Sequence, residues 1–209
     1  NIHSDFALDF LQKNKKENVC LIAADKGVEF FIKTDWVPDV AVGDFDSLSA
    51  AGEKYLDSLK ETEIVRLKPE KDDSDTQSAV NFAIDRGAKN ITIFGATGNR
   101  IDHLLANFGL LVLGRERGTD IILIDQWNYM KLVESGTVLK KKEQFGKYVS
   151  FFSLEGDMPG LTLVGFKYPL DHYHLRVSDS GLTVSNEIEA EEAVVSFDGK
   201  SLLMLMTRD

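Results

Sequence analysis

Short apolar runs alternate with helical patterns along the first part of the chain. The runs are rich in β-branched residues and mostly lack period-2 alternation, which is typical of strands buried on both faces of a parallel sheet. They cover residues 19–23, 40–42, 64–67, 91–94 and 121–124. Between them, helical patterns predict helices over residues 49–60, 74–86 and 101–113. This alternation predicts an α/β fold built on a parallel sheet.

Local signals support the ends of these helices. Ser49 stands where a side-chain oxygen would cap the first turn, and Gly87 stands where the end of the second helix favours glycine. The third helix is predicted to turn a single apolar stripe toward the core. That stripe consists of Ile101, Leu104, Leu105, Phe108, Leu111 and Val112.

The pattern changes near residue 125, where short strand candidates separated by turn residues replace the helices. These candidates cover residues 130–133, 138–141, 148–154, 161–164, 172–177, 182–184, 193–197 and 202–206. Such a series is typical of an all-β sandwich. We therefore predict an N-terminal, Rossmann-like parallel-sheet domain over residues 1–126, followed by a C-terminal β-sandwich domain over residues 127–209.

The charge balance narrows the choice of partners. Asp and Glu number 34 against 24 Lys and Arg, a net charge of −10, which disfavours nucleic acid and anionic membranes as general partners. An acidic protein that binds phosphate needs metal cations or a few focused basic residues. Cys20 is the single cysteine, so an internal disulfide is excluded and a reducing, cytoplasmic setting is favoured. Its apolar neighbours predict a buried thiol, and no apolar run is long enough to span a bilayer.

Aspartates gather where the predicted strands end. Asp25 follows the first strand, and Asp44 and Asp46 follow the second. Further along, Asp72, Asp73 and Asp75 follow the third strand, and Asp102 follows the fourth and its loop. The carboxyl ends of parallel strands line one edge of a sheet, so these carboxylates are predicted to converge there. Clustered carboxylate oxygens favour Mg²⁺, which keeps positions open for phosphate oxygens.

Each motif also has an ordinary structural explanation. Asp44 and Asp46 could be solvated turn residues or caps, and the acidic run before Asp75 could simply favour the start of a helix. Gly95 and Gly98 form only a weak phosphate-loop signal. The joint placement at one edge of the sheet is what favours a site.

Basic residues lie beside these carboxylates. Arg100 precedes a predicted helix start, where backbone N–H groups and a guanidinium can hold phosphate together. Lys71 adjoins the acidic run, and a solvated surface lysine is an equally good explanation for it. His172 and His174 would share one strand face, but ordinary strand residues are the better interpretation. The Gly-rich Lys-Ser/Thr motif of P-loop kinases is absent from the sequence.

Taken in order, the motifs resemble one family, the thiamine pyrophosphokinases. The family pattern has an aspartate after an early strand, then Pro-Asp, Gly-Asp-Phe-Asp-Ser, Lys-Asp-x-Thr-Asp, Gly-x-x-Gly-Gly-Arg-x-Asp-His and Ser-Asn-Glu. The matching positions here are Asp25 and residues 38–39, 43–47, 71–75, 95–103 and 185–187. Three positions depart from the pattern: Lys26 stands in place of a glycine, Ser74 of the threonine and Asn99 of the second glycine.

The resemblance implies a Mg²⁺-dependent transfer of pyrophosphate from ATP to the thiamine hydroxyl, giving thiamine diphosphate and AMP. It also implies a homodimer whose active sites are shared between subunits. For metal binding it implies Asp25, Asp44, Asp46, Asp72 and Asp75. For ATP it implies Asp25, Ser47, Lys71, Gly95, Gly98 and Arg100. For catalysis it implies Asp44, Asp46, Asp75, Arg100 and Asp102, with Asp75 or Asp102 as base, and for thiamine it implies His103, Ser185 and Asn186.

Other functions remain open from the residues alone. The strand followed by Asp44 and Asp46 also resembles that of phosphohydrolases in which the first aspartate is the nucleophile. A pyrophosphokinase for another alcohol, such as a pterin, would differ mainly in its acceptor pocket. A non-catalytic thiamine or nucleotide sensor on the same fold is a further alternative, which the full acidic set disfavours.

Overall fold

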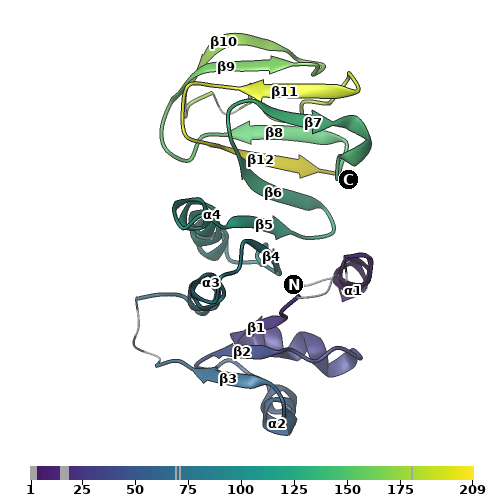
Figure 1. Ribbon diagram of the computed structural model, residues 1–209, viewed down its shortest axis with the longest axis vertical. Helices are drawn as coiled ribbons and strands as arrows, with labels where there is room; N and C mark the ends of the chain where they lie inside the picture. Colours follow the sequence, from purple (N-terminus) through teal and green to yellow (C-terminus); the bar gives the residue numbers. More distant parts are fainter. Residues whose placement is uncertain (1–3, 15–18, 69, 71, 180) are drawn as a thin grey trace. The chain divides into compact units, whose positions relative to one another are not determined.

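The computed structural model describes residues 4–14, 19–68, 70, 72–179 and 181–209. The chain divides into two compact units, residues 1–119 and residues 120–209 (Figure 1). This division falls before the predicted boundary after residue 126, because the strand that starts at Asp120 pairs with the strand that follows it. None of the helices among the described residues is long and apolar enough to cross a membrane.

The first unit contains a three-stranded parallel sheet. Its strands are β1 (Ile22–Ala24), β2 (Val40–Gly43) and β3 (Glu63–Arg66), in the order β1-β2-β3. Ala23 pairs with Ala41, and Val42 with Val65, which places the carboxyl ends of the strands at one edge. The predicted strands 19–23, 40–42 and 64–67 are thus confirmed as parallel neighbours. The fourth predicted strand is present as β4 (Asn90–Phe94), outside this three-stranded sheet.

Helices cover both faces of this sheet. The segment η1 (Asp25–Lys33) is a 3-10 helix, and α2 (Ala50–Ser58) and α3 (Asp75–Asp85) are α-helices. Ala41 of β2 packs in a cluster with residues of η1 and α2, whereas Val40 and Val42 pack with Ala79 of α3. Figure 1 shows α2 and α3 on opposite sides of the sheet. The sheet therefore has two apolar faces, as a buried parallel sheet requires.

The predicted Ser49 cap is confirmed, and the structure shows a second serine cap at Ser74. Ser49 Oγ accepts a hydrogen bond from Gly52 N at 3.2 Å, and Ser74 Oγ accepts one from Gln77 N at 3.1 Å. Gly87 has a φ of 89° just beyond α3, the left-handed conformation that favours glycine. Both η1 and the N-terminal helix α1 (Ser4–Lys13) went unpredicted. The rings of Phe6 and Phe10 of α1 both pack edge-on against the ring of Phe94 in β4. The two rings of α1 also contact each other in a tilted arrangement.

The predicted apolar stripe is only partly correct for the next helix, α4 (Ile101–Glu116). Leu111 is buried as predicted, together with Leu110, but Ile101 and Leu105 are 72% and 63% exposed. Cys20 is also exposed rather than buried. In both places the sequence pattern identified apolar side chains, but the described residues leave them exposed.

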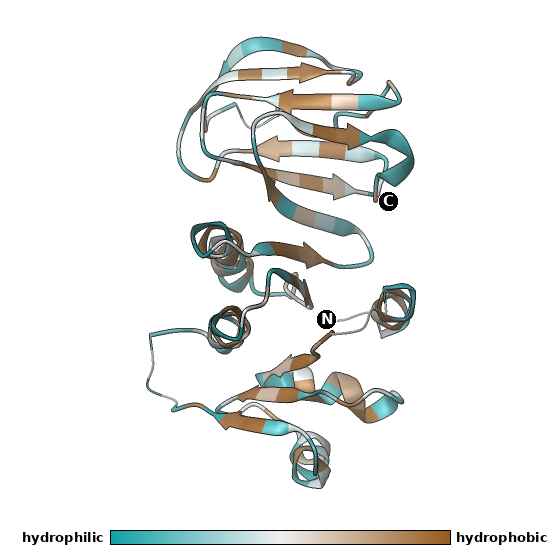
Figure 2. Cartoon of the chain, in the orientation of Figure 1, coloured by the Kyte–Doolittle hydropathy of each residue, from teal (hydrophilic) through white to brown (hydrophobic). Residues whose placement is uncertain are grey.

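The second unit is built from antiparallel strands. One sheet contains β5 (Asp120–Ile124), β6 (Asn128–Val133), β12 (Leu202–Thr207) and β8 (Tyr148–Phe152), in that spatial order. The other contains β10 (Leu170–Leu175), β9 (Met158–Val164), β11 (Glu192–Ser196) and β7 (Thr137–Lys140), with the short 3-10 turn η2 (Lys141–Glu143) after β7. Buried side chains from both sheets form one apolar cluster, including Phe151, Leu161, Val195 and Leu202. Figure 2 shows hydrophobic strands joined by hydrophilic turns in this unit.

One strand prediction is wrong, whereas the predicted strand over residues 121–124 is present as β5, which pairs antiparallel with β6. Residues 182–184 form a turn rather than a strand, because the Thr183 side chain is buried and its hydroxyl bonds the Phe151 carbonyl. The chain is therefore a mixed α/β protein with a parallel sheet first and antiparallel sheets later. The finer descriptions, Rossmann-like and β-sandwich, stay predictions.

Candidate active site

Three carboxylates converge at the carboxyl edge of the parallel sheet. Asp25 opens η1 directly after β1, whereas Asp44 and Asp46 follow β2. One oxygen from each of the three lies within 4.8 Å of the others. We call Asp25, Asp44 and Asp46 the acidic cluster. Two loops therefore meet where the strand arrangement predicts that they should.

The backbone at the acidic cluster is tightly fitted. Asp25 and Phe45 adopt φ values of 44° and 63°, which residues other than glycine seldom adopt. A Cβ added at Gly43 would lie 2.9 Å from the Asp25 Cα, so a larger residue there would push the two loops apart. Phe45 is buried, which anchors the loop that carries the two other carboxylates. The close approach of the loops thus depends on a glycine and a buried ring.

Hydrogen bonds tie the two loops together. Ser47 Oγ donates to Asp25 Oδ2 at 2.6 Å, and Glu29 Oε1 accepts from Ser49 N at 2.7 Å. Within the second loop, Asp46 N donates to Asp44 Oδ1 at 3.2 Å. The other Asp25 oxygen, Oδ1, is buried and has no hydrogen-bond partner among the described residues. A cation near this oxygen would supply what the protein does not.

The carboxylates repel one another. The negative charge of Asp44 is the largest cause that raises the pKa of Asp46, and desolvation and a hydrogen bond with Asp44 add to it. The charges of Asp25 and Asp75 raise the pKa further. Asp75, in the first turn of α3, therefore lies close enough to act on the acidic cluster. A bound cation would remove this repulsion.

The acidic run before α3 is divided between different surroundings. Asp72 is exposed, whereas Asp73 accepts hydrogen bonds from Gln77 Nε2 at 2.7 Å and Asn81 Nδ2 at 3.2 Å. Asp73 thus fastens the start of α3. Lys71, predicted to contact ATP, lies outside the described residues.

At the start of α4, an arginine is paired with an aspartate. Arg100 donates from Nε and Nη2 to the two oxygens of Asp102, at 3.1 and 2.5 Å, and both side chains are exposed. His103 N also donates to Asp102 at 2.9 Å. The Arg100 hydrogen bonds are the main reason that the pKa of Asp102 falls to about 2. Asp102 is therefore a fixed anion here, and His103 has a backbone contact in this turn.

The glycine loop between β4 and α4 has its own support. Gly95 has a φ of 75°, which explains a glycine there, and the space around Gly98 is open for a Cβ. Asn107 of α4 is buried and donates from Nδ2 to the Ala96 carbonyl at 3.0 Å. Asn107 thus holds the loop against its helix. An asparagine on an otherwise apolar helix face was a signal available in the sequence.

The Ser-Asn-Glu segment (residues 185–187) lies in the second unit, where Ser185 is exposed and has a φ of 57°. Asn186 is only 2% exposed. Its Oδ1 accepts from Tyr168 N at 3.0 Å and Glu187 N at 2.9 Å, and its Nδ2 donates to Tyr168 O at 2.7 Å. The Asn186 backbone also exchanges two hydrogen bonds with Val149. The Asn186 amide therefore organises this segment, and the Ser185 hydroxyl is the exposed group.

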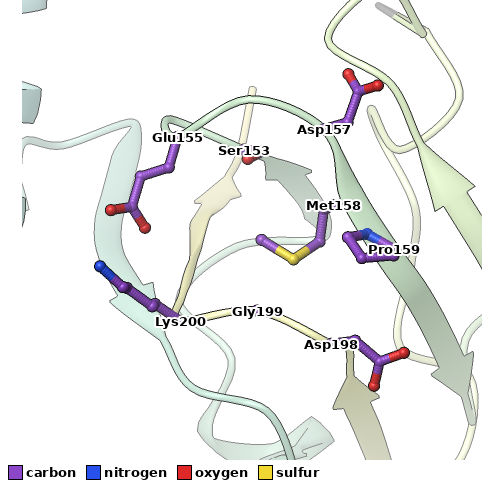
Figure 3. Close-up of a pocket in the computed structure, with 8 residues that line it drawn as sticks. All are labelled: Ser153, Glu155, Asp157, Met158, Pro159, Asp198, Gly199 and Lys200. Carbon is purple, nitrogen blue, oxygen red and sulfur yellow. The ribbon is translucent and has the colours of Figure 1, made fainter.

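A shallow cleft in the second unit does not involve the predicted residues. It has a volume of about 310 Å³. Its lining consists of Ser153, Glu155, Asp157, Met158, Pro159, Asp198, Gly199 and Lys200. Figure 3 shows Asp157 and Asp198 pointing away from the Met158 thioether, and Glu155 and Lys200 pointing toward each other. Its carboxylates do not converge as those of the acidic cluster do.

The comparisons with known proteins agree with the site motifs. Residues 11–123 match the family model "Thiamin pyrophosphokinase, catalytic domain", and residues 136–202 match "Thiamin pyrophosphokinase, vitamin B1 binding domain". A thiamine pyrophosphokinase from Bacillus subtilis (strain 168) is 33% identical over 92% of this chain and 89% of its own length.

Solved structures give the same result. The crystal structure of thiamine pyrophosphokinase from Bacillus subtilis matches with a TM-score of 0.85 and 32% identity, over 95% of this chain and 92% of that one. The enzyme from Geobacillus thermodenitrificans matches with a TM-score of 0.82 and 31% identity, over 95% and 91% of the two chains. With both halves of its sequence matched in order, the chain belongs to the thiamine pyrophosphokinase family.

Proposed function

We propose that this chain carries out the reaction of its family at the acidic cluster. In that reaction the thiamine hydroxyl attacks the β-phosphorus of ATP, giving thiamine diphosphate and AMP. The observation that carries the proposal is the convergence of Asp25, Asp44 and Asp46 within 4.8 Å at the strand ends. Phosphoryl chemistry depends on positioning and charge neutralisation, and this edge of the sheet can provide both.

The acidic cluster suits Mg²⁺. All its donors are carboxylate oxygens, the ligands that this hard cation prefers. Two observations agree with a cation-binding site here. A buried Asp25 oxygen has no hydrogen-bond partner among the described residues, and the pKa of Asp46 is raised, chiefly by the charge of Asp44. Bound there, Mg²⁺ would neutralise phosphate charge and stabilise the leaving AMP. Asp25, Asp44 and Asp46 would hold it, with Asp72 and Asp75 as neighbouring carboxylates.

Asp75 is our candidate for the proton acceptor. Its charge acts on Asp46, so it lies beside the acidic cluster. Asp102, the other candidate, is bonded to Arg100 with a pKa near 2, which makes it a weak base in this state. We therefore give Asp102 the role of orienting Arg100.

Arg100 is placed to bind a phosphate group of ATP. Asp102 occupies its Nε and one Nη2 position, which leaves other N–H donors of the guanidinium for a ligand. It stands at the start of α4, where backbone N–H groups also favour an anion. Gly95 and Gly98 would let the loop before Arg100 approach the nucleotide. Ser47 and Lys71, which the family motifs also include, would be further contacts of ATP.

For thiamine we propose the Ser-Asn-Glu segment and His103. The exposed Ser185 hydroxyl would make the direct contact, and Asn186 would hold it in place through its bonds to Tyr168 and Glu187. We further propose a homodimer in which each site draws on both subunits, because the family resemblance implies it. The free Cys20 thiol agrees with a reducing compartment, and we place the reaction in the cytoplasm.

The family assignment does not favour the alternatives. A phosphohydrolase using Asp44 as nucleophile would form an aspartyl-phosphate, and a pterin pyrophosphokinase would accept another alcohol.

A direct assay tests the proposal. The purified protein is incubated with ATP, Mg²⁺ and thiamine, and the products are identified by mass. We expect thiamine diphosphate and AMP in equal amounts, and no product after chelation of the metal. Release of ADP and phosphate, or a covalent phosphoryl-enzyme, would contradict it.

A further inference from the structure

Arg66 occupies a particular place beside the acidic cluster. It is the last residue of β3 and pairs in register with Gly43, the last residue of β2. Leu67 N continues the pairing by donating to Gly43 O at 2.9 Å. Arg66 therefore stands at the carboxyl edge of the sheet, next to the segment that carries Asp44 and Asp46.

The Arg66 guanidinium is held by an aromatic ring of that segment. Its Cζ lies 5.5 Å from the centroid of the Phe45 ring, over its face. Phe45 is buried and stands between Asp44 and Asp46 in the sequence, so the ring is a fixed support. Stacking on an aromatic face orients the planar fork of an arginine without using any of its N–H donors.

A second arginine at the opposite edge of the sheet provides a contrast. The Arg86 guanidinium lies over the Phe82 ring at 4.2 Å, and its Nη atoms donate to both oxygens of Glu63, the first residue of β3, at 2.7 Å each. Arg66 has no carboxylate partner among the described residues, although the chain has 34 acidic residues and three of them form the acidic cluster nearby. The donors of Arg86 serve the fold, whereas those of Arg66 remain available.

We propose that Arg66 binds the polyphosphate of the nucleotide, as a substrate-binding residue for the proposed transfer to thiamine. A phosphate group held at the acidic cluster has oxygens on its far side that still need donors, and a planar fork meets them in pairs. Thiamine is a cation, so the guanidinium discriminates in favour of the anionic substrate. The inference rests on the proposed function for the location of ATP.

Binding without turnover gives the direct test. Wild type, Arg66→Ala, Arg66→Lys and the control Arg86→Lys are titrated calorimetrically with Mg²⁺ and an ATP analogue that has a methylene between its α- and β-phosphates. We expect Arg66→Ala to weaken binding by on the order of tenfold to a hundredfold, with Arg66→Lys in between. Arg86→Lys should bind as wild type. An unchanged dissociation constant in Arg66→Ala overturns the proposal.

A second measurement separates ligand binding from simple support of the Phe45 loop. Mn²⁺ alone, followed by its paramagnetic signal, reports the acidic cluster without nucleotide. Removing a nearby positive charge should leave Mn²⁺ binding by Arg66→Ala unchanged or stronger, while binding of the analogue weakens. If both weaken together, Arg66 only holds the loop and the proposal fails.

The same variants keep the two proposals apart. If wild type binds the analogue, Arg66→Ala binds it weakly and thiamine is never pyrophosphorylated, the proposed function fails and the role of Arg66 stands. If turnover occurs and Arg66→Ala keeps the wild-type KM for ATP, the role of Arg66 fails and the proposed function stands.

Discussion

In the acidic cluster like charges lie close together, whereas in the Ser-Asn-Glu segment the Asn186 amide uses both its oxygen and its nitrogen in hydrogen bonds. Asp44 raises the pKa of Asp46, and a buried oxygen of Asp25 lacks a hydrogen bond within the described part of the chain. By contrast, the Asn186 side chain alone makes hydrogen bonds to Tyr168 and Glu187. The first region leaves a carboxylate oxygen for the proposed cation, whereas the Asn186 amide of the second is occupied by contacts within the protein. Substitutions in the acidic cluster should therefore reduce activity without reducing stability, whereas Asn186→Ala should reduce stability.

The largest effect is expected at the acidic cluster. Asp44→Asn or Asp46→Asn should reduce Mg²⁺-dependent turnover by more than about a hundredfold, because each removes a charge that holds the ion. The free energy of unfolding should stay unchanged or rise, because a repulsion between carboxylates is lost. Steady-state assays at saturating Mg²⁺ and urea titrations measure the two quantities. Near-normal activity in both variants would remove the metal assignment.

Asn186→Ala should behave the other way. It removes the three hydrogen bonds made by the buried Asn186 amide, two to the Tyr168 backbone and one to Glu187 N, so the free energy of unfolding should fall by about 2 kcal/mol. The KM for thiamine should rise more than that for ATP, because the Ser185 hydroxyl loses its position. Denaturant titration and two-substrate kinetics check both parts. Unchanged stability together with an unchanged thiamine KM would contradict the role of Asn186.

Mixed dimers sharpen the comparison further. Refolding Asp44→Asn together with Asn186→Ala subunits should restore part of the activity, because a shared site can then combine two intact halves. Sedimentation that finds a fully active monomer would exclude shared sites.

Arg100→Lys should give an intermediate loss. It keeps the charge but not the planar fork, so kcat/KM for ATP should fall by about tenfold, with little change for thiamine. Arg100→Ala should lose more, and it also frees Asp102, whose pKa of about 2 depends first on Arg100. Titration of Asp102 by NMR follows this directly, and the pKa should rise in Arg100→Ala. If kinetics for ATP are unchanged in both variants, Arg100 is only a surface residue.

The smallest expected effect is a pH-dependent one at Glu187. Its pKa is lowered chiefly by the hydrogen bond from Lys167 Nζ, 2.9 Å away. A lowered carboxyl pKa contributes stability above the unfolded-state pKa, and that stability disappears as the pH falls through the folded-state pKa. Glu187→Gln should therefore lower Tm at pH 7 by a small amount, and the difference from wild type should shrink in acid. A difference that is constant from pH 7 to pH 3 would exclude this linkage.

Much of the first unit could be predicted from the sequence because its signals are local. Ser49 and Ser74 indicate where α2 and α3 begin, and β-branched runs indicate β1, β2 and β3. The convergence of Asp25, Asp44 and Asp46 then follows from strand polarity alone. The family resemblance supplied the reaction, which no local pattern contains.

Other features depend on contacts that no local pattern encodes. The apolar run that forms β5 looks like the other apolar strands, and nothing local in it shows that it pairs antiparallel with β6. Glu29 and Arg66 acquire their positions from neighbours about twenty residues away along the chain. The exposure of Ile101 and Leu105 is likewise decided by what the fold leaves uncovered, not by helical period.

Because Asp25 is the first residue of η1, the proposed ion site would couple ion binding to the opening of that segment. Any opening of η1 would move Asp25 away from Asp44 and Asp46, and an ion held by all three would be released. By mass action, the ion must then lower the population of the open state. The amide hydrogens of η1 should therefore exchange with deuterium more slowly when Mg²⁺ is added, while those of β12, far along the chain, keep their rates.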